Sequence, residues 1–84
     1  MSDVDLDTIQ PDKVVDARGM ACPGPLLEAK KAIGTIQVGQ TVEVRSGDPS
    51  TKNDIPTWAT KVGHEYLGAA AGDGYDRIFI RRRK

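Results

Sequence analysis

The segment that decides the fold is VVDARGMACPGPL, residues 14–26. It opens with two β-branched valines, which favour a strand, and Gly19 ends that strand. The Pro-Gly-Pro run at residues 23–25 then marks a turn into a helix. A proline suits the first helical turn because its missing N–H would be unpaired there anyway. The segment therefore predicts a short strand that leads directly into a helix, with Cys22 at the junction.

Downstream of this junction the pattern continues as helix, strand, helix and two strands. Apolar residues recur at helical spacing up to Gly34 and Gly39, which bracket the helix end. Residues 41–45 then alternate, which predicts a half-buried strand. The apolar positions of the helix are Leu26, Ala29, Ile33 and Ile36. In the strand, Val42 and Val44 are expected on one side, and Thr41, Glu43 and Arg45 on the other, in water.

The second helix follows the Gly-Asp-Pro break at residues 47–49, and its start is ambiguous. Thr51 and Asp54 fit a capping box, but Pro56 would then lie too deep in the helix and clash with the preceding turn. An irregular first turn, or a start nearer Asp54, would resolve the conflict. The expected core face is Ile55, Trp58, Ala59 and Val62. Residues 64–71 and 75–81 are predicted strands, joined by a Gly-Asp-Gly turn.

This order predicts an α/β fold, a two-layer sandwich of type βαβαββ. We expect a four-stranded mixed sheet with two helices on one face, because the clearest strands have one apolar side only. Both strand–helix–strand crossovers should be right-handed, which allows parallel pairing across each, and the last two strands should form an antiparallel hairpin. Residues 1–12 are interpreted as a flexible acidic leader, and residues 13–84 as a single domain.

The composition restricts the chemistry. The chain has 84 residues, 12 basic and 12 acidic side chains, one cysteine and one histidine. A lone thiol excludes an internal disulfide and a thioredoxin-type pair, and with one histidine it cannot complete a zinc site. No apolar run is long enough to span a bilayer and no signal peptide is visible, so we expect a cytoplasmic protein with no metal ion or other cofactor.

Two interpretations of Cys22 remain open from spacing alone: a buried structural thiol, or an exposed reactive one. A thiolate just before a helix is stabilised by unpaired backbone N–H groups, and cysteine pKa values fall at such positions. Gly24 would let a partner approach closely, and Met20 and Leu27 would supply an apolar rim. A Cys–His hydrolase would need His64, which lies beyond the second helix, and the domain is too small for a substrate pocket. One exposed nucleophile suits the carriage of a group on sulfur.

The segment DARGMACPGPL, residues 16–26, resembles the Cys-Pro-x-Pro signature of the TusA/SirA family of small sulfur carriers. Gly47-Asp48-Pro49 and Asp54-Ile55-Pro56 resemble its second block, and Ile78–Arg81 resembles its closing strand. The resemblance covers residues 14–82. It implies a fold like the C-terminal domain of translation initiation factor 3, and it implies that Cys22 carries a persulfide.

The resemblance also implies partners. They are a cysteine desulfurase or rhodanese-like sulfur donor and a downstream sulfur-relay acceptor protein, serving tRNA 2-thiolation, cofactor assembly or cytoplasmic sulfur oxidation. The motif residues around Cys22 are Gly19, Met20, Pro23, Gly24 and Pro25.

Four further residues have two interpretations each. Asp48 and Asp54 are turn and cap residues, or they line the surface beside Cys22. Arg81 and Arg82 open a solvated basic tail, or they dock an acidic partner. The competing function is an RNA-binding or regulatory module with an incidental thiol. We expect no direct nucleic-acid binding, because the net charge is zero and no aromatic stacking face is evident.

Overall fold

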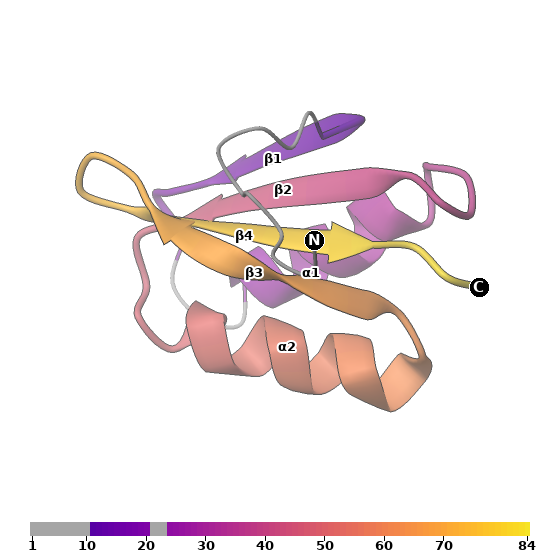
Figure 1. Cartoon of the computed structure of the whole chain (residues 1–84). Coiled ribbons are helices and arrows are strands. Elements are labelled where there is room, and N and C mark those ends of the chain that lie inside the picture. Colours follow the sequence, from indigo (N-terminus) through magenta and orange to yellow (C-terminus); the bar gives the residue numbers. More distant parts are fainter. Residues whose placement is uncertain (1–10, 21–23) are drawn as a thin grey trace, which may run out of the picture.

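The structure, a computed structural model, describes residues 11–20 and 24–84. Its elements follow the predicted order, and two helices cover one face of a four-stranded sheet (Figure 1). The two-layer α/β prediction is confirmed. The elements are β1 (Lys13–Ala17), α1 (Gly24–Ile33), β2 (Thr41–Ser46), α2 (Thr51–Val62), β3 (Glu65–Ala71) and β4 (Asp76–Arg81).

The sheet has the strand order β1-β2-β4-β3. β1 and β2 pair in parallel across the first crossover, as predicted, and β3 and β4 form the predicted antiparallel hairpin. The parallel pairing that the second crossover would have allowed does not form, because β4 lies between β2 and β3 and is antiparallel to both. The last strand thus occupies an interior position, which protects its backbone groups from solvent.

The core lies between the two helices and the face of the sheet that they cover, and its strand residues come from β2 and β4. Alternation along each strand places the predicted valines and isoleucines on this face. Trp58 packs against this core but is only partly buried. The prediction that Val62 lies in the core is wrong: Val62 is the last residue of α2 and is 39% exposed. The buried cluster includes Val42, Val44, Ile55, Ala59, Ile78 and Ile80.

The first turn of α2 is irregular, which was one of the two alternatives. The Asn53 and Asp54 N–H groups both donate to the Ser50 carbonyl, at 3.0 Å each. The capping box is wrong, because the helix starts at Thr51 and the Thr51 hydroxyl is buried 2.8 Å from the Ser46 hydroxyl. Pro56 lies inside the helix. It therefore removes one backbone bond there.

The polar side of β2 is not in water, contrary to the expectation. Glu43 is 2% exposed and Thr41 is 6% exposed. β2 is an interior strand, so both residues have neighbours on two sides: Glu43 pairs with Phe79 and Thr41 with Arg81. Two arginines also hold the Glu43 carboxylate. Alternation identified the face correctly, but exposure depended on the position of the strand in the sheet.

The C-terminal basic run, residues 81–84, is only in part a solvated tail, because its first two residues belong to the fold. Arg82 exchanges backbone hydrogen bonds with the loop before β2: its N–H donates to Gln40, and its carbonyl accepts from Gly39. Its guanidinium donates to the Ile36 carbonyl. Arg81 lies in β4 and pairs with Glu65. Arg82 therefore extends the fold, and only Arg83 and Lys84 are exposed.

We predict that deletion of residues 82–84 lowers the free energy of unfolding by about 1–3 kcal/mol, because two backbone hydrogen bonds and one charged bond are lost. Deletion of residues 83–84 is the matched control. It should cost less, about 0.5–1 kcal/mol, since it removes only an exposed ion pair and the exposed hydrogen bonds that Arg83 makes with His64 and Lys84 makes with Arg82. Urea unfolding of the three chains measures both values. Equal midpoints for the two truncations would contradict a structural role for Arg82.

Candidate functional site

One edge of the domain collects the loops that follow β1 and β2. The two strands are parallel, so both end at this edge, and both helices begin there (Figure 1). The loops touch: a Cβ on Gly47 would lie 3.1 Å from the Arg18 carbonyl oxygen. The carboxyl edge of parallel strands is where open α/β sheets place their ligand sites. We therefore take this edge as the candidate site.

The loop from β1 to α1 has its two described ends in contact. The Met20 N–H donates to the Ala17 carbonyl at 3.1 Å, which forms a turn at Arg18 and Gly19. A Cβ on Gly24 would lie 3.0 Å from the Met20 Cβ. Met20 therefore occupies the space that a Cβ on Gly24 would take, but Gly24 itself is partly exposed, and the close approach of a partner to it stays a prediction. Cys22 and Pro23, with Ala21, lie outside the described residues.

The start of α1 is electrostatically suited to an anion. The helix begins at Gly24, and Pro25 lies buried in its first turn, as predicted. That turn contains no acidic residue, while Lys30 and Lys31 occupy the last turn, near the negative end of the helix dipole. The first N–H groups of a helix have no partner within it, and no carboxylate of this turn competes for them.

Two apolar side chains flank this helix start. Met20 is 40% exposed and Leu27 is 49% exposed, both large hydrophobic residues in contact with water. Both side chains predicted for the apolar rim are therefore exposed, and their position around Cys22 stays a prediction. Exposed apolar side chains beside a functional loop are typical of a surface that another protein covers.

Asp48 organises the loop between β2 and α2. Its carboxylate accepts hydrogen bonds from the Ser50 N–H at 3.0 Å and the Ser50 hydroxyl at 2.9 Å. The Asp48 N–H in turn donates to the Ser46 hydroxyl. These bonds match the turn interpretation of Asp48. A surface beside Cys22 stays a prediction for Asp48 and Asp54, because Cys22 is outside the described residues.

Asp54 lines a surface groove between the two helices. The groove has a volume of about 360 Å³, and a second groove of about 300 Å³ lies between β1 and α1. We expected the domain to be too small for a pocket of a few hundred Å³. That expectation is wrong, because open surface grooves of this volume are present. The groove beside Asp54 is lined by Leu26, Lys30, Asn53, Asp54, Thr57, Trp58 and Lys61.

His64 lies at the opposite end of α2 from the candidate edge. A helix of 12 residues is about 18 Å long, so α2 separates the two. The imidazole packs edge-on against Trp58 and accepts a hydrogen bond from the Arg83 N–H. Burial, followed by the charges of Arg82 and Lys84, lowers the pKa of His64. This environment does not support a Cys–His hydrolase.

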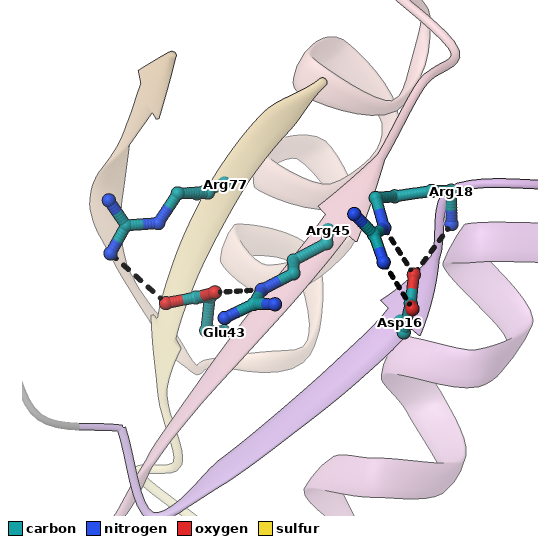
Figure 2. Close-up of polar contacts among 5 residues, drawn as sticks. All are labelled: Asp16, Arg18, Glu43, Arg45 and Arg77. Carbon is teal, nitrogen blue, oxygen red and sulfur yellow. Dashed lines mark hydrogen bonds and ion pairs between the residues drawn. The ribbon is translucent and has the colours of Figure 1, made fainter. Parts of the chain in front are cut away.

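The helix-free face of the sheet carries a polar network that the sequence reasoning missed (Figure 2). The buried Glu43 carboxylate accepts from Arg45 at 2.6 Å and from Arg77 at 3.3 Å. Beside it, Arg18 donates two side-chain hydrogen bonds to Asp16, at 2.8 and 2.9 Å. Alternation in residues 41–45 and 75–81 was the available signal. It was insufficient because only the pairing of β2 with β4 brings Glu43 and Arg77 together.

Within residues 11–20 and 24–84, no group of three or more His, Cys, Asp or Glu side chains is arranged to hold a metal ion. None of the described helices is long and apolar enough to cross a membrane.

Comparison with known proteins agrees with this architecture. Residues 13–82 match the family described as "Sulfurtransferase TusA". A candidate sulfur carrier protein of Archaeoglobus fulgidus is 46% identical over 71 residues, which cover 84% of this chain and 97% of that protein. The sulfur carrier protein TusA of Pseudomonas entomophila is 35% identical over 72 residues, which cover 86% of this chain and 90% of that protein.

A solved structure shares the fold. The crystal structure of a SirA-like protein from Desulfitobacterium hafniense superposes with a TM-score of 0.69 at 27% identity, covering 86% of this chain and 99% of that chain. The fold is thus that of a small two-layer α/β domain. The chain belongs to the TusA/SirA family of sulfur carriers.

We predict that Asp16 ionises far below the ordinary carboxyl range. Hydrogen bonds from the Arg18 side chain, and then from its backbone, lower the pKa of Asp16 from 3.8 to about 2. Because this folded-state pKa is depressed, the stabilisation is present above pH 3.8 and is lost as the pH falls toward 2. In Arg18→Gln the pKa should rise toward its ordinary value, as measured by carboxyl NMR titration.

Lys31→Gln is the matched control, because it removes a charge from an exposed ion pair with Glu28 on α1. It should leave the Asp16 titration unchanged. An Asp16 pKa near 3.8 in the unaltered chain would show that the Arg18 bonds do not hold in solution.

Proposed function

We propose that the protein carries sulfane sulfur as a persulfide on Cys22. Membership of a sulfur carrier family supports the function, and the helix start that follows the cysteine supports the residue. Cys22 stands two residues before Gly24, the first residue of α1. The observation that carries the proposal is this helix start, whose first turn contains no acidic residue. An anionic sulfur next to it would be stabilised.

The transfer balances without an oxidant or a reductant. The Cys22 thiolate attacks the outer sulfur of the donor's persulfide, so a new S–S bond forms and the donor's S–S bond breaks. The donor cysteine leaves as a thiolate, and the electron pair of the broken bond goes with it. In the second half, a thiolate of the acceptor attacks the terminal sulfur and Cys22 is released as a thiolate. The helix start favours both anionic forms of the carrier.

A donor and an acceptor protein complete the cycle. We infer a cysteine desulfurase or a rhodanese-like protein as the donor, and a downstream sulfur-relay protein as the acceptor. The receiving chemistry is tRNA 2-thiolation, cofactor assembly or sulfur oxidation. A cytoplasmic setting suits the proposal, because a reducing compartment keeps a lone thiol free of disulfides. The exposed Met20 and Leu27 supply the apolar contact for these partners.

We predict that a cysteine desulfurase with pyridoxal phosphate and cysteine, or a rhodanese with thiosulfate, adds the mass of one sulfur atom to the peptide that contains Cys22. A reductant should remove the added mass, and Cys22→Ser should show none. Intact-protein and peptide mass spectrometry check both results. No adduct with either donor would reject the proposal. An adduct that persists in Cys22→Ser would reject the assigned residue.

A second prediction tests the apolar rim. Met20→Ala and Leu27→Ala should slow sulfur loading from the protein donor, roughly tenfold if about 1.4 kcal/mol of contact energy is lost in the transfer complex. Val38→Ala is the matched control. Val38 is 61% exposed and lies in the loop that joins the end of α1 to the beginning of β2, at the opposite end of α1 from the helix start. Loading rates come from quenched time points by mass spectrometry. Equal rates for all three variants would exclude the rim as the docking surface.

A further inference from the structure

Residues 83–84 contact the segment that joins α2 to β3. The Arg83 N–H donates to Nδ1 of His64 at 3.2 Å, and the Arg83 guanidinium donates to the Glu65 carboxylate at 2.9 Å. The Lys84 side chain lies against Gly63, the C-cap of α2: a Cβ added to Gly63 would lie 2.8 Å from Lys84 Cε. We call these contacts of residues 83–84 with residues 63–65 the C-terminal latch.

Arg82, the residue before the latch, is held by a different part of the fold. Its backbone and its guanidinium form hydrogen bonds with the loop between α1 and β2. Arg82 is half-buried, while Arg83 and Lys84 are exposed. The Arg82 Nε also donates to the Lys84 carbonyl at 2.7 Å. Residues 83–84 can therefore leave the end of α2 without breaking the bonds that fix Arg82 to the domain.

The hydrogen bond at the imidazole is compatible with only one charge state of the ring. A ring nitrogen that accepts a hydrogen bond carries no proton, so in the latch His64 is neutral and its proton is on Nε2. Protonation of Nδ1 would place a second N–H group against the Arg83 N–H, which is itself a donor. The latch therefore loses this bond when His64 becomes charged.

The surroundings of His64 also disfavour its charged form. Burial, followed by the charges of Arg82 and Lys84, lowers the pKa of His64 from 6.5. From α2, the uncharged ring of Trp58 packs edge-on, with the two ring centroids 5.7 Å apart. The carboxylate next to the imidazole in the chain is already bound by two guanidinium groups. The charged groups around His64 are Glu65 of β3 and, beyond β4, Arg82, Arg83 and Lys84. A charged imidazole is thus repelled by neighbouring cations.

We propose that His64 is a pH-sensitive switch for the C-terminal latch. The neutral imidazole holds residues 83–84 at the end of α2, and the charged imidazole releases them, because it loses the Arg83 bond and repels Lys84. Arg82 keeps its place in both states. The switch lies at the opposite end of α2 from the candidate edge and acts independently of the proposed sulfur carriage. Because the folded-state pKa of His64 is depressed, the latch is closed above pH 6.5 and opens as the pH falls through that lower pKa.

The order of residues 83–84 as a function of pH tests the switch by NMR on the full chain. The scan runs between about pH 8 and pH 5, where histidine is the side chain that ordinarily titrates. Order parameters from α-carbon relaxation of Arg83 and Lys84 should fall with the midpoint of the His64 ring titration. The neutral ring should show the Nε2–H tautomer in its nitrogen shifts. Order parameters that do not change, or a neutral ring with its proton on Nδ1, would overturn the proposal.

His64→Asn is the matched variant without a titrating group. The asparagine amide oxygen can accept the Arg83 N–H as Nδ1 does, but it gains no proton in this pH range. The order parameters of residues 83–84 should therefore remain high over the whole scan. A fall in His64→Asn with the same midpoint as in the unaltered chain would show that another group senses the pH, and the proposal would be rejected.

Arg83→Pro tests the same coupling from the other side. Proline has no backbone N–H, so the bond to the imidazole is removed while Lys84 keeps its charge. A bond made only to the neutral ring lowers the pKa, so the pKa of His64 should rise toward 6.5 in this variant. Arg83→Gln keeps the backbone N–H and is the control, in which the pKa should stay below that of Arg83→Pro. Equal His64 titrations in Arg83→Pro and the unaltered chain would contradict the coupling.

Discussion

The parallel pairing of β1 with β2 is the constraint on which the rest of the structure depends. Parallel neighbours must end at the same edge, and each of these two strands is followed by a helix. The loops after them therefore lie close together: a Cβ added to Gly47 would lie 3.1 Å from the Arg18 carbonyl oxygen. A short chain thereby gains two helix starts at one edge without an additional domain.

This edge differs from the pocket of a typical small-molecule enzyme. The residues that surround it are either held in turns, as Asp48 is, or exposed and apolar, as Met20 and Leu27 are. Such a surface is suited to contact with another protein, which would supply the enclosure that the carrier lacks. A sulfur carrier must meet a donor and an acceptor in turn, so an open site is an advantage over a closed one.

The two faces of the sheet are stabilised in different ways. The helix side is an apolar core in which aliphatic side chains from β2 and β4 meet those of α1 and α2. The other side depends on charge: an almost fully buried Glu43 is held by two guanidinium groups. Removing one partner of such a buried group is costly, because the remaining charge stays desolvated. The charged sheet face opposite the helices therefore contributes to the stability of the domain.

The sequence by itself determined the order of the elements, the α/β class, the helix start at the Pro-Gly-Pro turn and the resemblance of residues 14–82 to sulfur carriers. These follow from local signals: alternation, helical spacing, glycine and proline positions, and a short motif. It did not determine that β4 enters the sheet between β2 and β3, because strand neighbours depend on packing far along the chain. That single placement buried Glu43, brought Arg77 to it and tied Arg82 to the loop before β2. Only the tertiary structure decides such contacts, since burial is a property of the neighbours and not of the residue.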